Sequence, residues 1–533
     1  MRVYCNPVNV PYAYQFKKDP RDRYKMTVNR EAADPSMVMF QGKYYLFASM
    51  TGSVWVSEDM AHWDSYPLPE NMPIYDYAPD VRAIGEYLYF TASSRDVKCS
   101  FYRTKDPIHG PYEEIPGYMD YWDPNLFQDD DGRLYFYWGC ANATPIWGIE
   151  LDPATMEPMG QKKDLIFGDP YHIGYERFGE DHCEEPKSQA EIDALFQEFL
   201  DQCGEDADKI PEANKAMIRA TYAGMPYIEG AWMTKHAGKY YLQYACPGAE
   251  FNVYADGVYV ADAPLGPFHL AENNPFSYKP GGFLPGAGHG STMQDRRGQW
   301  WHTATMRISK NHVFERRVGI WPAGFDDVGN LYCNQRYGDW PYIIEDIEKD
   351  PWADPRWYLL SYRAKVTSSG CEKGHEAALV VDENVQTWWK AKELDAEPWL
   401  CLDLETCDHV HVVQINFADD MEKVVRIIYL NEEDDLIVKD ELVTGEKEAL
   451  VTWIMVTPAE AKIIGKNQIE LAKDGHRMLL TVAAPDDVEM KLWSNAPLHV
   501  FDEPNPGSMR VGFETYLPAN RKNLLKVTLN LIR

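Results

Sequence analysis

A short pattern that recurs five times constrains the fold of this 533-residue chain more than any other feature. Each copy is a glycine followed by a strand-like run rich in aromatic residues, such as Lys-Tyr-Tyr-Leu-Phe after Gly42. Glycine adopts the positive φ that a tight hairpin turn requires, and aromatic side chains favour the middle of a sheet. The pattern therefore predicts five similar hairpins, with turns at Gly42, Gly85, Gly132, Gly238 and Gly298.

The spacing of these glycines indicates how the hairpins are organised. The first three are 43 and 47 residues apart, which is the length of one four-stranded blade of a β-propeller. The next interval, of 106 residues, has room for a blade and a helical insertion at about residues 170–225. Apolar residues there follow Ser188, a favoured N-cap, at helical spacing. We therefore predict an all-β fold with a five-bladed β-propeller over residues 1–345. A β-sandwich with similar hairpins is the alternative.

The sequence changes character after residue 345. The charged stretch 346–356, which contains Pro351, predicts a linker. The residues beyond it are strand-rich but lack the glycine-aromatic pattern. We predict a second domain, a β-sandwich, over residues 357–533.

Charge and cysteine content exclude several classes of protein. Asp and Glu total 83 against 52 Lys and Arg, so the net charge of −31 disfavours a nucleic-acid or anionic membrane partner. A neutral substrate such as an oligosaccharide is expected instead. The sequence has no apolar run long enough to span a membrane, and its start does not resemble a signal peptide. Ten cysteines without paired spacing predict reduced thiols, so we expect a cytoplasmic protein unless a secretory signal has been removed. The oligomeric state is left open.

Three acids and a histidine precede the turn glycines at nearly the same distance. Asp34 lies 8 residues before its glycine, and Asp123, Glu229 and His289 each lie 9 before theirs. If the repeats are blades, equivalent positions on the inner strands converge on the propeller axis. Carboxylates brought together in this way repel one another, so at least one is expected to have a raised pKa.

This arrangement matches the chemistry of glycoside hydrolysis. One carboxyl must carry a proton for the leaving oxygen, while another stays ionised to activate water. Asp34 and Asp123 also have a plainer explanation, since Asp-Pro pairs often begin turns, and His289 fits a core histidine as well as a neighbour of an ion. Glu229 has no such explanation, because an unpaired acid inside an apolar segment is costly. Four aromatic residues are candidates to stack on sugar rings, with core packing as the alternative: Trp55, Tyr77, Trp122 and Trp232.

With these residues the chain resembles glycoside hydrolase family 43, the five-bladed propeller enzymes that act on arabinofuranosides and β-xylosides. The matching stretches occur in family order: Ala33-Asp34-Pro35, Tyr77-Ala78-Pro79-Asp80-Val81, Trp122-Asp123-Pro124-Asn125, Glu229-Gly230-Ala231-Trp232 and Gly288-His289-Gly290. Relatives often have Gly-His-Asn at the last of these, and the insertion before Glu229 is longer than usual.

The resemblance implies a role for each site residue. Asp34 would be the general base and Glu229 the general acid of an inverting reaction, with Asp123 modulating the pKa of the acid. A substrate-binding arginine is expected near the pocket, and Arg316 fits this position better than Arg317. His289 would lie on the axis beneath the sugar, where some relatives hold a calcium ion through water. No cofactor is required.

The expected function is exo-acting removal of terminal α-L-arabinofuranosyl or β-D-xylosyl units from plant-type oligosaccharides. The same chemistry on another sugar, by a galactosidase or galactofuranosidase, is one alternative, and a non-catalytic carbohydrate-binding propeller is another. In the C-terminal region, residues 378–389 and 399–404 resemble discoidin-like carbohydrate-binding domains. For that region a scaffold role competes evenly with sugar binding.

Overall fold

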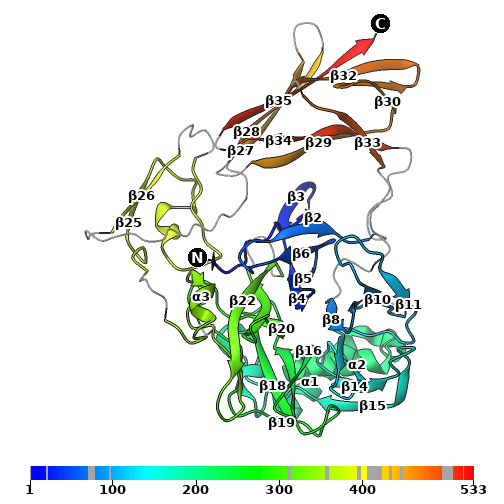
Figure 1. Ribbon diagram of the computed structural model, residues 1–533, viewed down its shortest axis with the longest axis vertical. Coiled ribbons are helices and arrows are strands. Elements are labelled where there is room, and N and C mark those ends of the chain that lie inside the picture. Colours follow the sequence, from blue (N-terminus) through cyan, green and yellow to red (C-terminus); the bar gives the residue numbers. More distant parts are fainter. Residues whose placement is uncertain are drawn as a thin grey trace. The chain divides into compact units, whose positions relative to one another are not determined.

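Five four-stranded antiparallel sheets follow one another along the chain, one for each sequence repeat (Figure 1). The five turn glycines have φ between 60 and 86°, as the hairpin prediction requires. Blade I contains β4 (Ala33–Phe40), β5 (Lys43–Ser49), β6 (Ser53–Ser57) and β7 (Asp64–Pro67). Blade II contains β8 (Asp80–Ile84), β9 (Tyr87–Thr91), β10 (Phe101–Thr104) and β11 (Glu113–Ile115). Blade III contains β12 (Asn125–Gln128), β13 (Leu134–Trp138), β14 (Ile146–Leu151) and β15 (Pro158–Ile166). Blade IV contains β16 (Glu229–His236), β17 (Lys239–Cys246), β18 (Ala255–Ala261) and β19 (His269–Leu270). Blade V contains β20 (Gly288–Gln294), β21 (Trp300–Arg307), β22 (Arg316–Phe325) and β23 (Leu331–Cys333). The prediction of a five-bladed propeller is confirmed.

The structure is a computed structural model. It describes residues 2–19, 22–69, 72, 78–94, 98–279, 281–308, 314–354, 359–392, 398–404, 423–430, 435–444, 448–485, 487–494, 508–519 and 521–532. The chain divides into two compact units, residues 1–414 and 415–533. No helix within the described ranges is long and apolar enough to cross a membrane.

Apolar side chains fill the spaces between neighbouring blades. Phe47 of blade I packs with Phe90 of blade II, and Tyr137 of blade III lies in one cluster with Leu242 of blade IV. Trp301 of blade V is fully buried in the cluster that also contains Met37 of blade I. Each such side chain stabilises the fold by about 1.5–3 kcal/mol through its removal from water. The core is therefore distributed around the ring.

A polar contact also links each blade to the next at the inner strands. At four of the five junctions a side-chain oxygen of one blade accepts a hydrogen bond from a backbone N–H of the other. At the junction of blades IV and V, the indole Nε1 of Trp232 donates to the carbonyl of Thr292 at 3.1 Å. The other four pairs are Val81 to Ser36, Leu126 to Asp80, Met233 to Asn125 and Met37 to Ser291, with donor–acceptor distances of 3.0, 2.7, 2.8 and 2.9 Å. These contacts fix the register of each inner strand against its neighbour.

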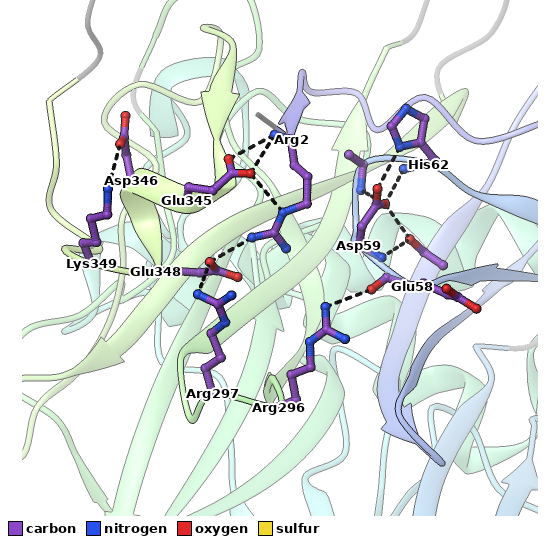
Figure 2. Close-up of polar contacts among 12 residues, drawn as sticks. Arg2, Glu58, Asp59, His62, Arg296, Arg297, Glu345, Asp346, Glu348 and Lys349 are labelled. Atoms are coloured by element: carbon purple, nitrogen blue, oxygen red, sulfur yellow. Dashed lines mark hydrogen bonds and ion pairs between the residues drawn. The ribbon is translucent and has the colours of Figure 1, made fainter.

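The N-terminal segment joins the end of blade V. Strand β1 (Val3–Tyr4) pairs with β24 (Tyr342–Ile343), which leads into the short helix α3 (Ile344–Ile347). Arg2 lies between two acids of this region (Figure 2): Nε is 3.2 Å from Glu345 and Nη2 is 2.8 Å from Glu348. Arg297, in the turn of blade V, also contacts Glu348, at 2.5 Å (Figure 2). A hairpin of β2 (Tyr14–Asp19) and β3 (Asp22–Arg30) then leads to blade I.

The predicted helical insertion lies between β15 and β16. It comprises η1 (Gly174–Glu176), η2 (Glu180–His182), α1 (Gln189–Cys203), η3 (Gly204–Lys209) and α2 (Glu212–Ala223). Ser188 caps α1 in a capping box with Glu191, as the sequence predicts. The buried carboxylate of Glu176 accepts a hydrogen bond from Tyr244 of blade IV at 2.5 Å. The insertion is thus fastened to the propeller near where it leaves the sheet.

The second unit is a β-sandwich. One sheet has the order β27 (Lys423–Leu430), β28 (Leu436–Val443), β35 (Lys522–Ile532), β32 (His476–Ala484), β31 (Gln468–Lys473) and β30 (Glu460–Gly465). The other has the order β29 (Ala449–Thr457), β34 (Met509–Leu517) and β33 (Met490–Ser494). Buried residues of both sheets, including Leu480 and Phe513, form one core.

The sandwich begins later than the sequence suggested. The division of the chain falls at residues 414 and 415, whereas the predicted domain begins at residue 357. The intervening part holds β25 (Lys365–Ser368), η4 (Ala377–Val380) and β26 (Leu400–Asp403), whose residues are largely exposed or half-buried. Val385 in this part packs against the core cluster shared by blades I and V, and the part is grouped with the first unit. The segments that resemble discoidin-like domains lie here, outside the sandwich.

Candidate active site

The site is built on one backbone position that all five blades share. Just before or within the start of each inner strand, one residue adopts the left-handed conformation. These residues are Asp34, Ala78, Asp123, Gly230 and His289, with φ of 52, 45, 50, 62 and 53°. Non-glycine residues rarely adopt this conformation, and such strain concentrates at functional sites. In blades I, IV and V the strand pairing is interrupted at the same point, as in a β-bulge.

The strand register corrects one prediction. The count from the turn glycines made Glu229 equivalent to Asp34 and His289. However, Glu229 pairs across its hairpin in the way that Ala33 and Gly288 do, so Gly230 holds the equivalent position. The count went astray because the turns differ in length: blades I and IV have two-residue turns, whereas blades III and V have five-residue turns that place the glycine one residue farther from the shared position. A Cβ at Gly230 would lie 2.8 Å from the ring of His289, which explains why glycine occupies this position.

The structure nevertheless brings the predicted acids together. Nδ1 of His289 lies 3.3 Å from Oδ1 of Asp34 and 3.6 Å from Oδ2 of Asp123. Asp123 accepts a hydrogen bond from the backbone N–H of Gly230 at 3.1 Å. A carboxylate oxygen of Asp123 is within 4.8 Å of one of Glu229. Residues from four blades therefore form one cluster at the axis.

The electrostatics of the cluster agree with the expected repulsion. Burial, together with the nearby charges of Glu229 and Asp34, raises the pKa of Asp123 to about 7. Burial opposes the charging of His289, but the carboxylates of Asp34, Asp123 and Glu229 outweigh it and raise its pKa. The imidazolium of His289 thus offsets part of the negative charge around it. The prediction that at least one acid has a raised pKa is confirmed at Asp123.

The backbone of the left-handed residues is held by buried polar side chains. The N–H of Asp34 donates to Thr305 at 2.7 Å, and that of Asp123 donates to Ser93 at 3.0 Å. The N–H of His289 donates to Asp256 at 2.8 Å, and Nε2 of the fully buried His302 lies 2.8 Å from the other oxygen of Asp256. These supports hold the strained positions in place. Sequence reasoning missed them because the four counts back from the turn glycines do not reach them.

Glu229 lies between two neutral donors. Oε1 accepts a hydrogen bond from Tyr254 at 2.5 Å, and Oε2 accepts one from the thiol of Cys140 at 3.1 Å. Burial, with the neighbouring carboxylates, raises the pKa of both Tyr254 and Cys140 well above their usual values, so both remain protonated. Cys140 lies in the loop between β13 and β14 of blade III, and no spacing in the sequence indicates its contact with Glu229.

Two neighbouring arginines have different surroundings. Arg316 contacts Oδ1 of Asp34 through Nη1 at 3.7 Å and the buried Glu31 through Nε at 2.9 Å. Arg317 instead lies over the ring of Tyr12, with Nη2 3.8 Å from Glu315. The predicted choice of Arg316 over Arg317 therefore agrees with its place beside Asp34.

The predicted aromatic platforms need correction. Trp55 is completely buried in the cluster between blades I and V, so no sugar ring can reach it. Trp232 is also buried, and the guanidinium of Arg82 covers its ring at 3.4 Å from the centroid. Both were predicted as platforms because sequence cannot tell an inward from an outward face of a blade. Trp122 is 38% exposed beside Asp123, and Tyr77 lies outside the described residues.

The contacts of His289 show that its Nδ1 is not a direct calcium ligand, and a calcium ion held through water stays a prediction. Calcium takes six to eight oxygen ligands, whereas Nδ1 of His289 faces two carboxylates that its own proton neutralises. Within the described part of the chain, one group of metal-type donors lies within mutual reach, Asp123, Cys140 and Glu229. Its thiol is held protonated and is not a calcium ligand. No step of the chemistry below is assigned to a metal.

Comparisons with known proteins agree with this architecture. The model of a family described as glycosyl hydrolases family 43 matches residues 25–176 and 194–329. A β-xylosidase of Xylanibacter ruminicola is 29% identical over 171 residues, which are 31% of this chain and 41% of that protein. The xylosidase/arabinosidase 43A of Humicola insolens is 26% identical over 280 residues, 46% of this chain and 80% of that protein. The crystal structure of a thermostable family-43 glycoside hydrolase aligns with a TM-score of 0.42 and 22% identity, over 57% of this chain and 93% of that one.

Proposed function

This chain belongs to the glycosyl hydrolases of family 43, and we propose that it removes terminal β-D-xylosyl or α-L-arabinofuranosyl units from oligosaccharides with inversion of configuration. The observation that carries the proposal is the meeting of Asp34, Asp123, Glu229 and His289 at the propeller axis. A binding protein for neutral sugars has no need of three acids in one buried cluster. The names of the relatives support the two sugars.

Asp34 is assigned the role of general base. It lies beside the imidazole of His289, at 3.3 Å, and the guanidinium of Arg316, at 3.7 Å. An ionised carboxylate accepts a proton from the water that attacks the anomeric carbon. Attack from the side opposite the leaving group inverts the configuration.

Glu229 is assigned the role of general acid, which donates a proton to the leaving oxygen. The N–H of Gly230 donates to Asp123, so the backbone next to Glu229 is tied to that acid. Because Asp123 and Glu229 lie close together, their charges disfavour simultaneous ionisation, and the pair retains a proton near neutral pH. Asp123 is therefore assigned a supporting role, in which it shares that proton with Glu229 and holds the backbone beside it.

Exo action is supported by the position of the insertion. Glu180 of η2 forms an ion pair with Arg307, at the end of β21 beside Arg316. Arg307 also donates to the carbonyl of Glu250 at 2.8 Å. Burial and the charge of Glu229 raise the pKa of the Glu250 carboxyl, so the loop between β17 and β18, which contains Glu250, lies near the general acid. An insertion fastened there leaves less room for a polysaccharide chain to pass through.

The test is a set of aryl glycosides with the anomer of the first product followed by NMR. We expect hydrolysis of a xyloside or an arabinofuranoside and an inverted product. Retention of configuration would remove the base role of Asp34. Hydrolysis only of a galactoside or galactofuranoside would keep the mechanism and replace the sugar. If no glycoside is cleaved while soluble xylo-oligosaccharides still bind, the protein is a binding module.

A further inference from the structure

We propose that Cys140 is a positioning residue for the general acid, and that its weak thiol donor keeps Oε2 of Glu229 free to give its proton to the leaving group. This inference rests on the proposed function, since it concerns the same carboxyl. It assigns a role to a residue that the catalytic scheme above leaves unused. It also identifies which oxygen of Glu229 delivers the proton.

The two donors to Glu229 are unequal. A phenol O–H forms a strong hydrogen bond to a carboxylate, whereas a thiol is a weak donor. The Tyr254 contact is 2.5 Å and involves a side chain that is 1% exposed. The Cys140 contact is 3.1 Å and involves a half-buried residue. Oε1 is thus held firmly on the protein side, and Oε2 is held loosely.

This inequality determines the direction of proton transfer. To protonate a glycosidic oxygen, one carboxyl oxygen of Glu229 must exchange its present partner for the substrate. Loss of the thiol contact costs less free energy than loss of the phenol contact, because the thiol bond is weaker. Cys140 is also the more accessible of the two donors. The substrate therefore meets Oε2, while Tyr254 stabilises the carboxylate that remains after the transfer.

The thiol also sets how readily Glu229 holds a proton. A donor to a carboxylate stabilises the ionised form and makes the acid stronger. A serine hydroxyl in place of the thiol would do this more effectively, so Glu229 would lose its proton at lower pH. Alanine would remove the donor and have the opposite effect. The two substitutions are therefore expected to move the alkaline limb of the pH–rate profile in opposite directions.

The experiment measures kcat/KM against pH for wild type, Cys140→Ser and Cys140→Ala, with a phenyl glycoside of the sugar that the wild type prefers. We expect the alkaline limb of Cys140→Ser to move down by about half to one pH unit, and that of Cys140→Ala to move up. At pH 8 the serine variant should be roughly 3- to 10-fold slower than wild type. Cys401→Ser, which changes an exposed thiol in β26, is the matched control and should leave the profile unchanged.

A second variant and a second substrate keep the test decisive. Tyr254→Phe removes the strong donor at Oε1, so its alkaline limb should move up even if a Cys140 variant folds poorly. A 2,4-dinitrophenyl glycoside needs no proton on its leaving group, so the Cys140 substitutions should barely change its rate. Equal losses on both substrates with no movement of the limb would show that Cys140 only fills space. An inactive wild type would instead overturn the proposed function, and this inference with it.

Discussion

The two sides of the active site are held by opposite kinds of chemistry. Asp34 contacts His289 and Arg316, and Arg316 also pairs with the buried Glu31. Glu229 stands among neutral donors, Tyr254 and Cys140. The partners of Asp34 include basic groups, whereas the hydrogen-bond donors to Glu229 are a phenol and a thiol. The difference suggests that the base and the acid are distinguished by their surroundings, since both are carboxylates on inner strands.

The largest expected effects come from replacing the base or the acid and measuring hydrolysis of two substrates, one whose leaving group needs a proton and one whose leaving group does not. Asp34→Asn should lower kcat about 10³-fold on both a xylobiose-type substrate and a 2,4-dinitrophenyl glycoside, because both need activated water. Glu229→Gln should cause a similar loss on the first substrate and a much smaller loss on the second. Steady-state rates on the two substrates give the comparison directly. Equal losses for Glu229→Gln on both would contradict its role as the acid.

Removing one partner of Asp34 should lower the free energy of unfolding more than removing one partner of Glu229. Arg316→Met leaves Glu31 and Asp34 buried without that cation, and loss of one partner of a buried ion pair costs about 3–5 kcal/mol. Tyr254→Phe breaks a single hydrogen bond and should cost about 1–3 kcal/mol. Urea unfolding of the two variants measures the difference in the free energy of unfolding. If Arg316→Met were the milder change, the ion pairs would not be what holds the base side.

Asp123 makes the stability of the site depend on pH. Its pKa is about 7 in the folded protein, above that of an unfolded Asp, so the folded state binds the extra proton. Stability therefore falls as pH rises from about 4 through about 7. Asp123→Asn cannot ionise, so relative to wild type it should gain roughly 1–3 kcal/mol between pH 5 and pH 8. Thermal unfolding at the two pH values tests this, with the exposed Asp262→Asn as the control. If the difference in stability between Asp123→Asn and wild type were the same at pH 5 and pH 8, folding would not change how readily Asp123 ionises.

The smallest expected effect on activity comes from Trp122, and the buried Trp232 is the comparison for stability. Trp122→Ala should raise KM several-fold with little change in the free energy of unfolding, because the ring is partly exposed beside Asp123. Trp232→Ala should instead destabilise the protein by about 3–5 kcal/mol, since the indole is buried and links blades IV and V. KM measurements and denaturant unfolding distinguish the two. A KM unchanged by Trp122→Ala would place the sugar elsewhere.

Much of the propeller was predictable because its signals are local. A turn glycine and the aromatic strand after it depend on neighbouring residues, so Gly42 and its four counterparts could be recognised from the sequence. The convergence of Asp34, Asp123 and His289 followed from that repeat. The exact register did not follow from counting back to the glycines, because the turns of blades I and IV are two residues long and those of blades III and V are five. This is why Glu229 was assigned to the position that Gly230 holds.

Other features depend on contacts between distant parts of the chain. Trp55 and Trp232 have the residue type of a sugar platform, and only the packing of neighbouring blades shows that they are buried. Cys140 and Tyr254 come from blades III and IV and meet at Glu229, which no spacing indicates. The later start of the sandwich was missed for a similar reason. Strands β25 and β26 resemble a domain in sequence but bury too little to form one.

The left-handed residue of blade II offers an opening for redesign. Ala78 has the same backbone geometry as Asp34, Asp123 and His289 but carries only a methyl group. The scaffold already tolerates a strained residue there, and the amide of Ala78 is fixed by Ser49 at 2.8 Å. A functional group could therefore be installed at residue 78 without reshaping the backbone, and it would be the fourth among these five positions, since Gly230 has no side chain.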